Sequence, residues 1–411
     1  MSTAVETGPF AHLGELLAGR QLPGTDAEEW RYSRVERIDP GAFRVRGDGP
    51  VDEAASAAGE SVAAEVVASI GSVSGLAVLV DGVVVRVELD EAAGAAGVQV
   101  LGRPVDVPAA VAGSVDVFGE VNAVVADVAV RIEVPRGARL DDPFVVVHLV
   151  TLDGLVVAPR VEVELGEDAQ ATVVELHRSL GEIDSLVLPV SRFSVARDST
   201  VRHVLVQDLS TSEDVVVEVA ADVGQSGTYD GWAAALGGRY ARLRVDCRLA
   251  GRAAAGTLAA VYAGVGDQMH DLRTFQDHLD RDTRSSLEFK GTVDDRAHAV
   301  YTGLIRIHPE GRGSNAEQSN RIMTLSDEAW AESVPNLEIE HNDVRCAHAS
   351  TVGPVDADQR FYLESRGVPT EVAERLIVSG FADEILERCP VPGVAALVRP
   401  RLSSILGGVD R

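Results

Sequence analysis

Apolar and polar residues alternate along most of this chain. Between residues 98 and 355, short runs in which Val, Leu or Ile alternate with polar residues are separated by Gly, Asp or Asn. Alternation with a period of two over about four to eight residues is typical of half-buried β-strands. The pattern therefore predicts a mainly β core over residues 98–355. Clear examples are residues 128–134, 144–150, 160–165, 172–176 and 201–207.

Two architectures fit so many short strands: a pair of β-sandwiches, or one β-solenoid whose coils stack on each other. The strand-like runs continue through residues 98–355 without a Pro-rich joint, which favours the solenoid. No exact sequence period is visible, so periodicity alone leaves both architectures open.

The N-terminal flank of the core has a different pattern. Phe10, Leu13 and Leu17 recur at helical spacing before Pro23 and Gly24 end the pattern. Residues 49–75 are rich in Ala, Ser and Glu, which suits a helix or a mobile linker. In residues 29–33, two aromatic residues lie among charged ones, and we interpret them as packing residues. We therefore expect a mixed helical and strand region over residues 1–97.

Helical spacing returns after Gly353. Residues 356–366 have an acidic first turn and a basic last turn, and Gly367 supplies the stop. A second helical stretch follows Pro369, and its apolar side must pack on the core, on itself or on another protein. We therefore predict a C-terminal helical region over residues 356–411. The apolar residues at i, i+4 spacing in the second stretch are Val372, Leu376, Ile377, Phe381 and Ile385.

Charge and hydropathy limit the classes of partner. The chain of 411 residues has 37 Lys and Arg against 64 Asp and Glu, a net charge of −27, and it has no basic patch. Such a chain repels phosphate, so we expect neither nucleic acid nor an anionic membrane as a partner. No apolar run approaches the roughly 20 residues that span a bilayer. Its first residues lack a basic leader with an apolar stretch, so we expect a cytoplasmic protein.

Three cysteines lie far apart in the sequence, at positions 247, 346 and 389. This odd number argues against a disulfide framework and suits a reducing compartment. Cys247 lies in an alternating strand-like run, and Cys389 ends a helical pattern before a proline, so we expect both to be structural.

Cys346 differs because His348 follows two residues later. In a strand, residues two apart point to the same face, so the thiolate and the imidazole are able to share a soft metal such as iron. Without further information, the pair equally fits a partly buried thiol beside an exposed histidine. Nearby residues that would extend the ligand set are Glu338, Glu340, His341 and Asp343.

Other histidines are scattered along the core without a spacing that indicates a metal site. We interpret them as surface histidines or as buried ones with ordinary partners. Within this set, His298 and His308 are the best candidates for a relay. The set consists of His148, His177, His203, His270, His278, His298 and His308.

The segment from Pro335 to His348 resembles the C-terminal signature of the SufB/SufD family of iron–sulfur cluster assembly proteins. In this signature, Leu-Glu-Ile, an Asp-Val-x-Cys-x-His stretch, Thr-Val-Gly and Phe-Tyr-Leu-x-Ser-Arg-Gly follow one another. The resemblance implies a right-handed parallel β-helix with helical regions at both ends. The matching segments are residues 337–353, 356–359 and 361–367, with weaker support from residues 29–33, 303–308 and 316–321.

Within this family, the chain is more similar to the SufD type than to the SufB type. Asn320 lies where the SufB type has an acceptor cysteine, and no cysteine lies between Cys247 and Cys346. Two departures from the family pattern occur, in residues 340–342 and 349–350, and the first adds His341. The alternatives are a SufB-like, cluster-carrying scaffold and a carbohydrate-active enzyme on a β-helix. The aromatic content of 4% argues against the enzyme.

The resemblance implies a non-catalytic scaffold subunit of a SufBCD-type complex. Cys346 and His348 would hold a transient iron or iron–sulfur cluster shared with a SufB-like partner. Without that partner, the chain would be able to form a homodimer. A SufC-like ATPase would dock on residues 356–388. The chain has no Gly-x-x-x-x-Gly-Lys-[Ser/Thr] motif, so we expect it to bind no nucleotide. The expected ATPase contacts are Phe361, Tyr362, Leu363, Arg366, Leu376, Phe381 and Ile385.

Overall fold

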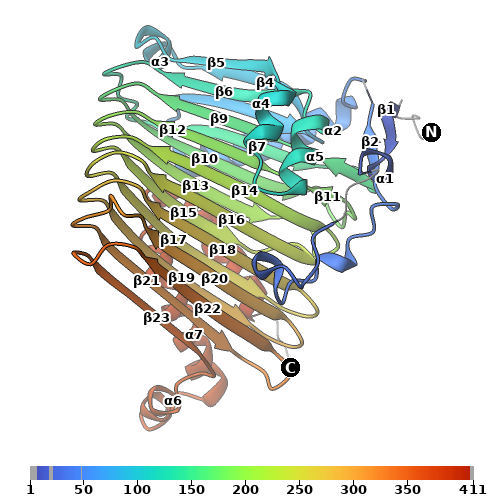
Figure 1. The fold of residues 1–411 in the computed structure, drawn as a ribbon. Coiled ribbons are helices and arrows are strands. Elements are labelled where there is room, and N and C mark those ends of the chain that lie inside the picture. The colour runs from blue at the N-terminus through green and yellow to red at the C-terminus, as the bar shows by residue number, and fades with distance from the viewer. Residues whose placement is uncertain (1–6, 18–21, 48, 408–411) are drawn as a thin grey trace.

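The computed structural model describes residues 7–17, 22–47 and 49–407. It is mainly β, with 44% of residues in strands and 23% in helices, and its strands form a β-solenoid of about eight turns (Figure 1). This confirms the predicted solenoid with helices towards both ends of the chain.

Each complete coil contributes strands to two sheets, and the coils pair by parallel hydrogen bonding. One sheet has thirteen strands: β1 (Thr7–His12), β2 (Arg44–Arg46), β5 (Gln99–Pro104), β6 (Val128–Val134), β8 (Leu155–Val157), β9 (Arg160–Leu165), β11 (Leu186–Val187), β12 (Val190–Val195), β14 (Asp214–Val223), β16 (Tyr240–Leu249), β18 (Met269–His278), β20 (His298–Ile307) and β22 (Trp330–Ile339). The other has ten: β3 (Gly75–Val80), β4 (Val83–Leu89), β7 (Phe144–Val150), β10 (Gln170–Ser179), β13 (Thr200–Asp208), β15 (Thr228–Ala235), β17 (Ala255–Gly264), β19 (Arg284–Val293), β21 (Asn315–Thr324) and β23 (Arg345–Gly353).

Alternation along each strand divides the side chains between the solenoid interior and its outer face. On β10, Val173 belongs to the large interior core, whereas Val174 and Leu176 belong to the cluster beneath the outer helices. Where both faces are covered, a strand can be apolar throughout, and every residue of β7 is buried. This double burial explains why the alternation is weakest in the Val-rich runs.

In one turn of each coil, one residue has a left-handed backbone conformation. The backbone amide of this residue donates a hydrogen bond to a carbonyl in the corresponding turn of the next coil, as from Asp198 N to the Gln225 carbonyl at 2.9 Å. Asp and Gly tolerate this conformation better than most residues, which explains the composition of these turns. The coils are therefore held in register at their turns as well as along their strands. The residues with positive φ in this series are Gly137, Asp168, Asp198, Ser226, Ala253, Asp282 and Gly313.

Helices from both ends of the chain cover the outer face of the ten-stranded sheet. They are α2 (Glu53–Ile70), α7 (Thr370–Leu386) and α8 (Pro392–Gly407), and they share one apolar cluster with that sheet. Helix α2 begins at Asp52, whose carboxylate accepts hydrogen bonds from Ala54 N and Ala55 N. No helix in the described part of the chain is both long and apolar enough to cross a membrane. The shorter helix α6 (Ala357–Glu364) lies beyond the last coil (Figure 1).

The outer face of the thirteen-stranded sheet is covered by N-terminal elements. These are α1 (Leu13–Leu16), the short 3-10 helices η1 (Glu28–Trp30) and η2 (Val35–Arg37), α4 (Val107–Ala112) and α5 (Val117–Val125), while α3 (Glu91–Ala95) joins β4 to β5. Trp30 is 3% exposed, and the guanidinium of Arg242 lies 3.7 Å from its ring centroid. Trp30 of the aromatic motif is therefore a packing residue, whereas Tyr32 is 40% exposed. Phe10, expected in a helix, lies in β1.

The boundaries of the core differ from the sequence expectation at its N-terminal side. The ten-stranded sheet includes β3 and β4, which precede residue 98, and helices α4 and α5 lie within the range expected to be all β. Strands β4 and β5 pair antiparallel with β3 and β6 as the last strands of the two sheets, and they pack apolar side chains against the interior core at this end.

Glu213 is a fully buried carboxyl group just before β14. Its Oε2 accepts hydrogen bonds from Ser210 N at 2.8 Å and from the Ser179 hydroxyl, whereas Oε1 has no hydrogen-bond partner. Burial raises the pKa of Glu213 to about 7, and the carboxylates of Asp184 and Asp153 act in the same direction.

We predict that Glu213 makes folding stability fall between about pH 4.5 and pH 7. Its pKa in the folded state lies above 4.5, so the folded state binds the extra proton in this window. The free energy of unfolding should therefore decrease by up to about 3 kcal/mol as the pH rises through the window. Glu213→Gln, which mimics the protonated form, should remove this slope in denaturant titrations and stabilise the protein at pH 8. The exposed Glu182→Gln is the control and should keep the slope; an unchanged slope in Glu213→Gln would contradict the prediction.

Candidate functional site

The C-terminal end of the solenoid is open. Within the described chain, β22 pairs only with β20 and β23 only with β21, so each has one free backbone edge. Ile339 on β22 is 45% exposed, and Val352 on β23 is 42% exposed. Free strand edges with exposed apolar side chains are suited to pairing with another chain. At the N-terminal end, the last strands β4 and β5 likewise pair on one side only, but their apolar side chains pack against the interior core.

Cys346 and His348 lie on β23, on the face that continues the solenoid interior. Parallel pairing places Cys346 beside Ala316 and His348 beside Gln318, and both of these β21 side chains are buried. Cys346 is half-buried against the small apolar cluster of the last coils, whereas His348 is exposed. Burial raises the pKa of the Cys346 thiol. The two residues are therefore at the mouth of the solenoid, with one side open.

The acidic residues expected nearby are directed elsewhere. Glu338 forms an ion pair with Arg306 at 2.5 Å, and Asp343 forms one with Arg312 at 3.0 Å. Because Leu337 packs in the apolar cluster beside Cys346, its neighbour Glu338 points to the outer face of the coil.

His341 and Glu340 lie in the loop between β22 and β23. His341 Nδ1 accepts a hydrogen bond from the Asp343 amide at 3.0 Å, which fixes the loop, and Glu340 is exposed. Of the six residues proposed from the sequence, the structure thus brings only Cys346 and His348 together on the inward face.

Asn320 occupies a buried inward position one coil before Ser350, its partner in the parallel register. Its amide nitrogen donates to Ser333 Oγ at 2.9 Å, and its carbonyl lies 3.5 Å from the Tyr262 hydroxyl. An amide at this place cannot accept sulfur as a thiol does. The interior leading to the open end is therefore polar here but lacks a nucleophile at this position.

The residues expected to bind an ATPase divide into an exposed and a buried group. Phe361 is 69% exposed, Tyr362 56% and Leu376 53%. Arg366 stacks on Tyr362 with its guanidinium 4.6 Å from the ring centroid, and Leu363 is half-buried.

The buried group fastens α7 to the sheet. Ile385 is fully buried, and its carbonyl accepts a hydrogen bond from Trp232 Nε1 at 2.8 Å. Phe381 is half-buried, and the ammonium group of Lys290 lies 4.8 Å from its ring centroid. Contact between these two residues and another protein would require α7 to leave the sheet.

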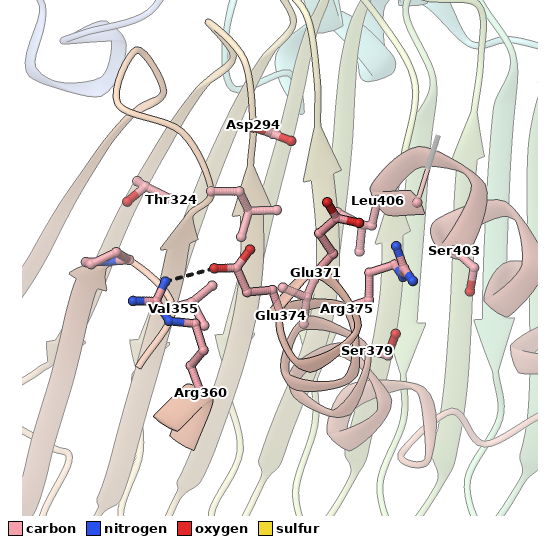
Figure 2. A pocket seen from close by; sticks show the side chains of 14 residues that line it. Asp294, Thr324, Val355, Arg360, Glu371, Glu374, Arg375, Ser379, Ser403 and Leu406 are labelled. Carbon is pink, nitrogen blue, oxygen red and sulfur yellow. Dashed lines mark hydrogen bonds and ion pairs between the residues drawn. The ribbon is translucent and has the colours of Figure 1, made fainter. Parts of the chain in front are cut away.

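A pocket of about 460 Å³ lies between the C-terminal helices and the last coils (Figure 2). Arg360 of α6 crosses it to form an ion pair with Glu374 of α7 at 2.9 Å. Glu371 and Arg375 add further charges to its wall. The pocket adjoins α6 and α7, so it lies beside the exposed group of apolar residues.

The remaining cysteines and the two histidines proposed as a relay do not form a reactive site. Burial raises the pKa of Cys247 to about 12 and that of Cys389 to about 11, so both thiols are inert at neutral pH. His298 begins β20 and His308 follows its end, so about 33 Å of strand separates them. They cannot form a direct relay.

Three histidines that were interpreted as surface or ordinarily partnered residues are buried around one carboxylate. They are His148, His177 and His203, and the carboxylate is Glu175. Burial lowers the pKa of His177 to about 4. Burial raises the pKa of Glu175, but the three imidazoles outweigh it and hold that pKa well below its usual range. The parallel register stacks His177 directly on His148, and no constant period in the sequence marks this stacking.

Comparisons with known proteins identify the family. Residues 148–381, more than half of the chain, match the family model described as SUF system FeS cluster assembly, SufBD core domain. An iron–sulfur cluster assembly SufBD family protein of Mycobacterium leprae is 32% identical over 252 residues, which are 59% of this chain and 62% of the relative. One of Mycobacterium tuberculosis is 30% identical over 286 residues, 68% of this chain and 70% of the relative. The iron–sulfur cluster assembly protein SufD of Escherichia coli is 26% identical over 300 residues, 72% of this chain and 71% of the relative. The chain belongs to the SufBD family of iron–sulfur cluster assembly proteins.

Proposed function

We propose that this chain is a SufD-type, non-catalytic scaffold subunit that builds an iron–sulfur cluster together with a SufB-like partner. The observation that carries the proposal is the position of Cys346 and His348 on the inward face of the last, open coil. One thiolate and one imidazole are suitable ligands for iron but cannot complete the coordination of a cluster. The other ligands would come from the chain that covers the open end.

Backbone pairing is the simplest way to bring that chain into place. The free edges of β22 and β23 offer main-chain hydrogen bonds, and Ile339 and Val352 offer apolar contacts. A second β-solenoid with a similar open end would place its own ligands opposite Cys346 and His348. The cluster is then cargo, held between two chains and released when they move apart.

Asn320 supports the SufD-type role over the SufB-type role. It replaces the acceptor cysteine that the resemblance to the SufB type would require, and it is already engaged by Ser333 and Tyr262. Sulfur would therefore be received by the partner, while this chain contributes ligands to the shared site.

The exposed residues of α6 and α7 support docking of a SufC-like ATPase. Phe361, Tyr362 and Leu376 leave apolar surface uncovered beside the pocket between the C-terminal helices and the last coils. Because Lys290 and Trp232 tie α7 to the ten-stranded sheet, movement of a docked ATPase would be transmitted to the coils. ATP hydrolysis by that partner would in this way open the shared cluster site.

Loss of either proposed cluster ligand should impair cluster delivery. Even partners that only orient metal ligands are worth on the order of 10–100-fold in metal affinity. Cys346→Ala and His348→Ala should therefore each lower the activity of an iron–sulfur client enzyme by at least about tenfold, in cells that depend on this pathway. His308→Ala is the matched control and should behave as wild type. Client activity equal to wild type in both site variants would refute the assignment, provided that both still co-purify with the ATPase.

Charge placed on the exposed face of α6 and α7 should prevent ATPase binding. Phe361→Glu and Leu376→Glu should each weaken co-purification with the SufC-like ATPase by roughly tenfold or more, since buried apolar anchors dominate binding energy. Leu180→Glu is the matched control, because Leu180 is 51% exposed and lies in the turn after β10. Undiminished binding by both variants would place the ATPase elsewhere on the chain.

A further inference from the structure

A polar cluster lies inside the solenoid, away from the open end. His148 is on β7, Glu175 and His177 are on β10, and His203 is on β13, so three successive coils contribute. Each of these side chains is at most 3% exposed. Around them the interior is built from Val, Leu and Phe side chains. A carboxylate with three imidazoles in such surroundings requires a physical explanation.

The imidazoles converge on Glu175. His148 Nε2 and His177 Nε2 lie 3.6 and 3.8 Å from Glu175 Oε2, and His203 Nε2 lies 3.1 Å from Oε1. The rings of His148 and His177 stack with centroids 4.3 Å apart and an interplanar angle of 8°. The donor atoms of His148, Glu175 and His177 all lie within 4.8 Å of one another.

Most of these polar atoms have no hydrogen bond. Neither ring nitrogen of His148 or His177 has a partner, and Glu175 Oε1 and His203 Nε2 also lack hydrogen-bond geometry. A buried polar group without a partner costs about 1–3 kcal/mol. His278, also buried, shows the ordinary solution: its nitrogens lie 2.8 and 2.9 Å from the hydroxyls of Thr283 and Ser285. The cluster around Glu175 lacks hydroxyl partners of this kind for the stacked rings.

A single proton on one imidazole would neutralise the carboxylate but would leave the second stacked ring without a partner. A cation bound between the rings and the carboxylate uses one nitrogen of each ring and balances the negative charge. We propose that His148, Glu175 and His177, with His203 as a fourth ligand, bind one divalent transition metal, Zn²⁺ or Fe²⁺. Imidazole and carboxylate donors suit both ions.

Binding would draw the donor atoms closer together than they lie in this structure. Ligand atoms at about 2.0–2.2 Å from a tetrahedral ion lie about 3.3–3.6 Å apart, so donors within 4.8 Å of one another would approach by up to about 1.5 Å. Outer partners are in place as well. The Ser191 hydroxyl donates to Glu175 Oε2 at 3.0 Å, and the Tyr229 hydroxyl lies 3.0 Å from His203 Nδ1. Such partners fix the orientation of metal ligands.

The proposed site is separate from the one at the open end. Six strand spacings separate β10 from β23 in the ten-stranded sheet, which is about 29 Å at about 4.8 Å each. The site also lacks a thiolate, and its ligands are shielded from solvent. It would therefore hold a static ion that cross-links three coils, acquired when the chain folds and not exchanged during cluster assembly.

The test measures metal in the purified full-length chain. Wild type would be expressed in minimal medium supplied with Zn²⁺, or with Fe²⁺ and kept anaerobic, then dialysed against a chelator. Elemental analysis should give about one equivalent of the supplied metal, and a Cys346→Ala/His348→Ala double variant should retain it. Glu175→Gln and His177→Gln should fall below about 0.1 equivalent, and their melting temperature should no longer depend on the metal. Comparing the metal content after growth with Zn²⁺ and after growth with Fe²⁺ shows which ion the site prefers.

His270→Gln is the matched control, because His270 is fully buried in the interior of a later coil. It should keep the full equivalent of metal. If folded wild type contains no metal after growth with Zn²⁺ and after growth with Fe²⁺, the proposal is wrong. This result would hold even if the Glu175→Gln and His177→Gln variants fail to fold. A metal that disappears in the Cys346→Ala/His348→Ala variant would overturn it too, since the ion would then belong to the open end.

Discussion

Parallel hydrogen bonding between coils is the constraint on which the rest of this structure depends. Strands β16, β18, β20 and β22 pair residue for residue, so each coil is a template for the next. A stack of this kind has no intrinsic end, and its last strands keep free edges unless something covers them. In the described chain, β4 and β5 at the N-terminal end and β22 and β23 at the C-terminal end each pair on one side only. Strands β4 and β5 pack apolar side chains against the interior core, whereas β23 carries the exposed His348 on its inward face. The proposed place for a partner therefore follows from which end of the interior is left uncovered.

The same pairing explains which parts of the site could be predicted. Alternation along one strand suffices to place Cys346 and His348 on one face, and it places Glu338 on the face opposite Leu337. Glu340, His341 and Asp343 lie in the loop between β22 and β23, which alternation does not orient. The buried histidine cluster depends instead on stacking between coils. The coil length varies, from 27 residues between Ser226 and Ala253 (253 − 226) to 31 between Asp282 and Gly313 (313 − 282). Without a constant period, the sequence does not reveal which residues stack.

The C-terminal helices show a second limit of sequence patterns. Spacing of i, i+4 predicted an apolar side on residues 370–386, and the helix α7 confirms it. The spacing did not reveal that Ile385 and part of Phe381 are buried against the ten-stranded sheet. The outer surface of that sheet is formed by residues far away in the sequence. Of the apolar residues expected to contact the ATPase, Leu376 of α7 and Phe361 and Tyr362 of α6 are exposed. The surface available for docking consists of the apolar residues that do not pack on the sheet. It is therefore smaller than the set of apolar residues that the sequence pattern identifies.

Burial separates the two proposed metal sites of this chain. At the open end, the proposed ligands are few, one side is uncovered and Cys346 is only half-buried, so a bound iron or cluster would be free to leave. Around Glu175, four donors are enclosed by a dry interior, and release would require three coils to separate. In a later coil, the buried imidazole of His278 is instead partnered by the hydroxyl groups of Thr283 and Ser285. If both proposed sites bind metal, a solenoid built in this way would exchange iron at its end and keep a fixed cation in its interior, because exchange at each site is governed by how many coils must open.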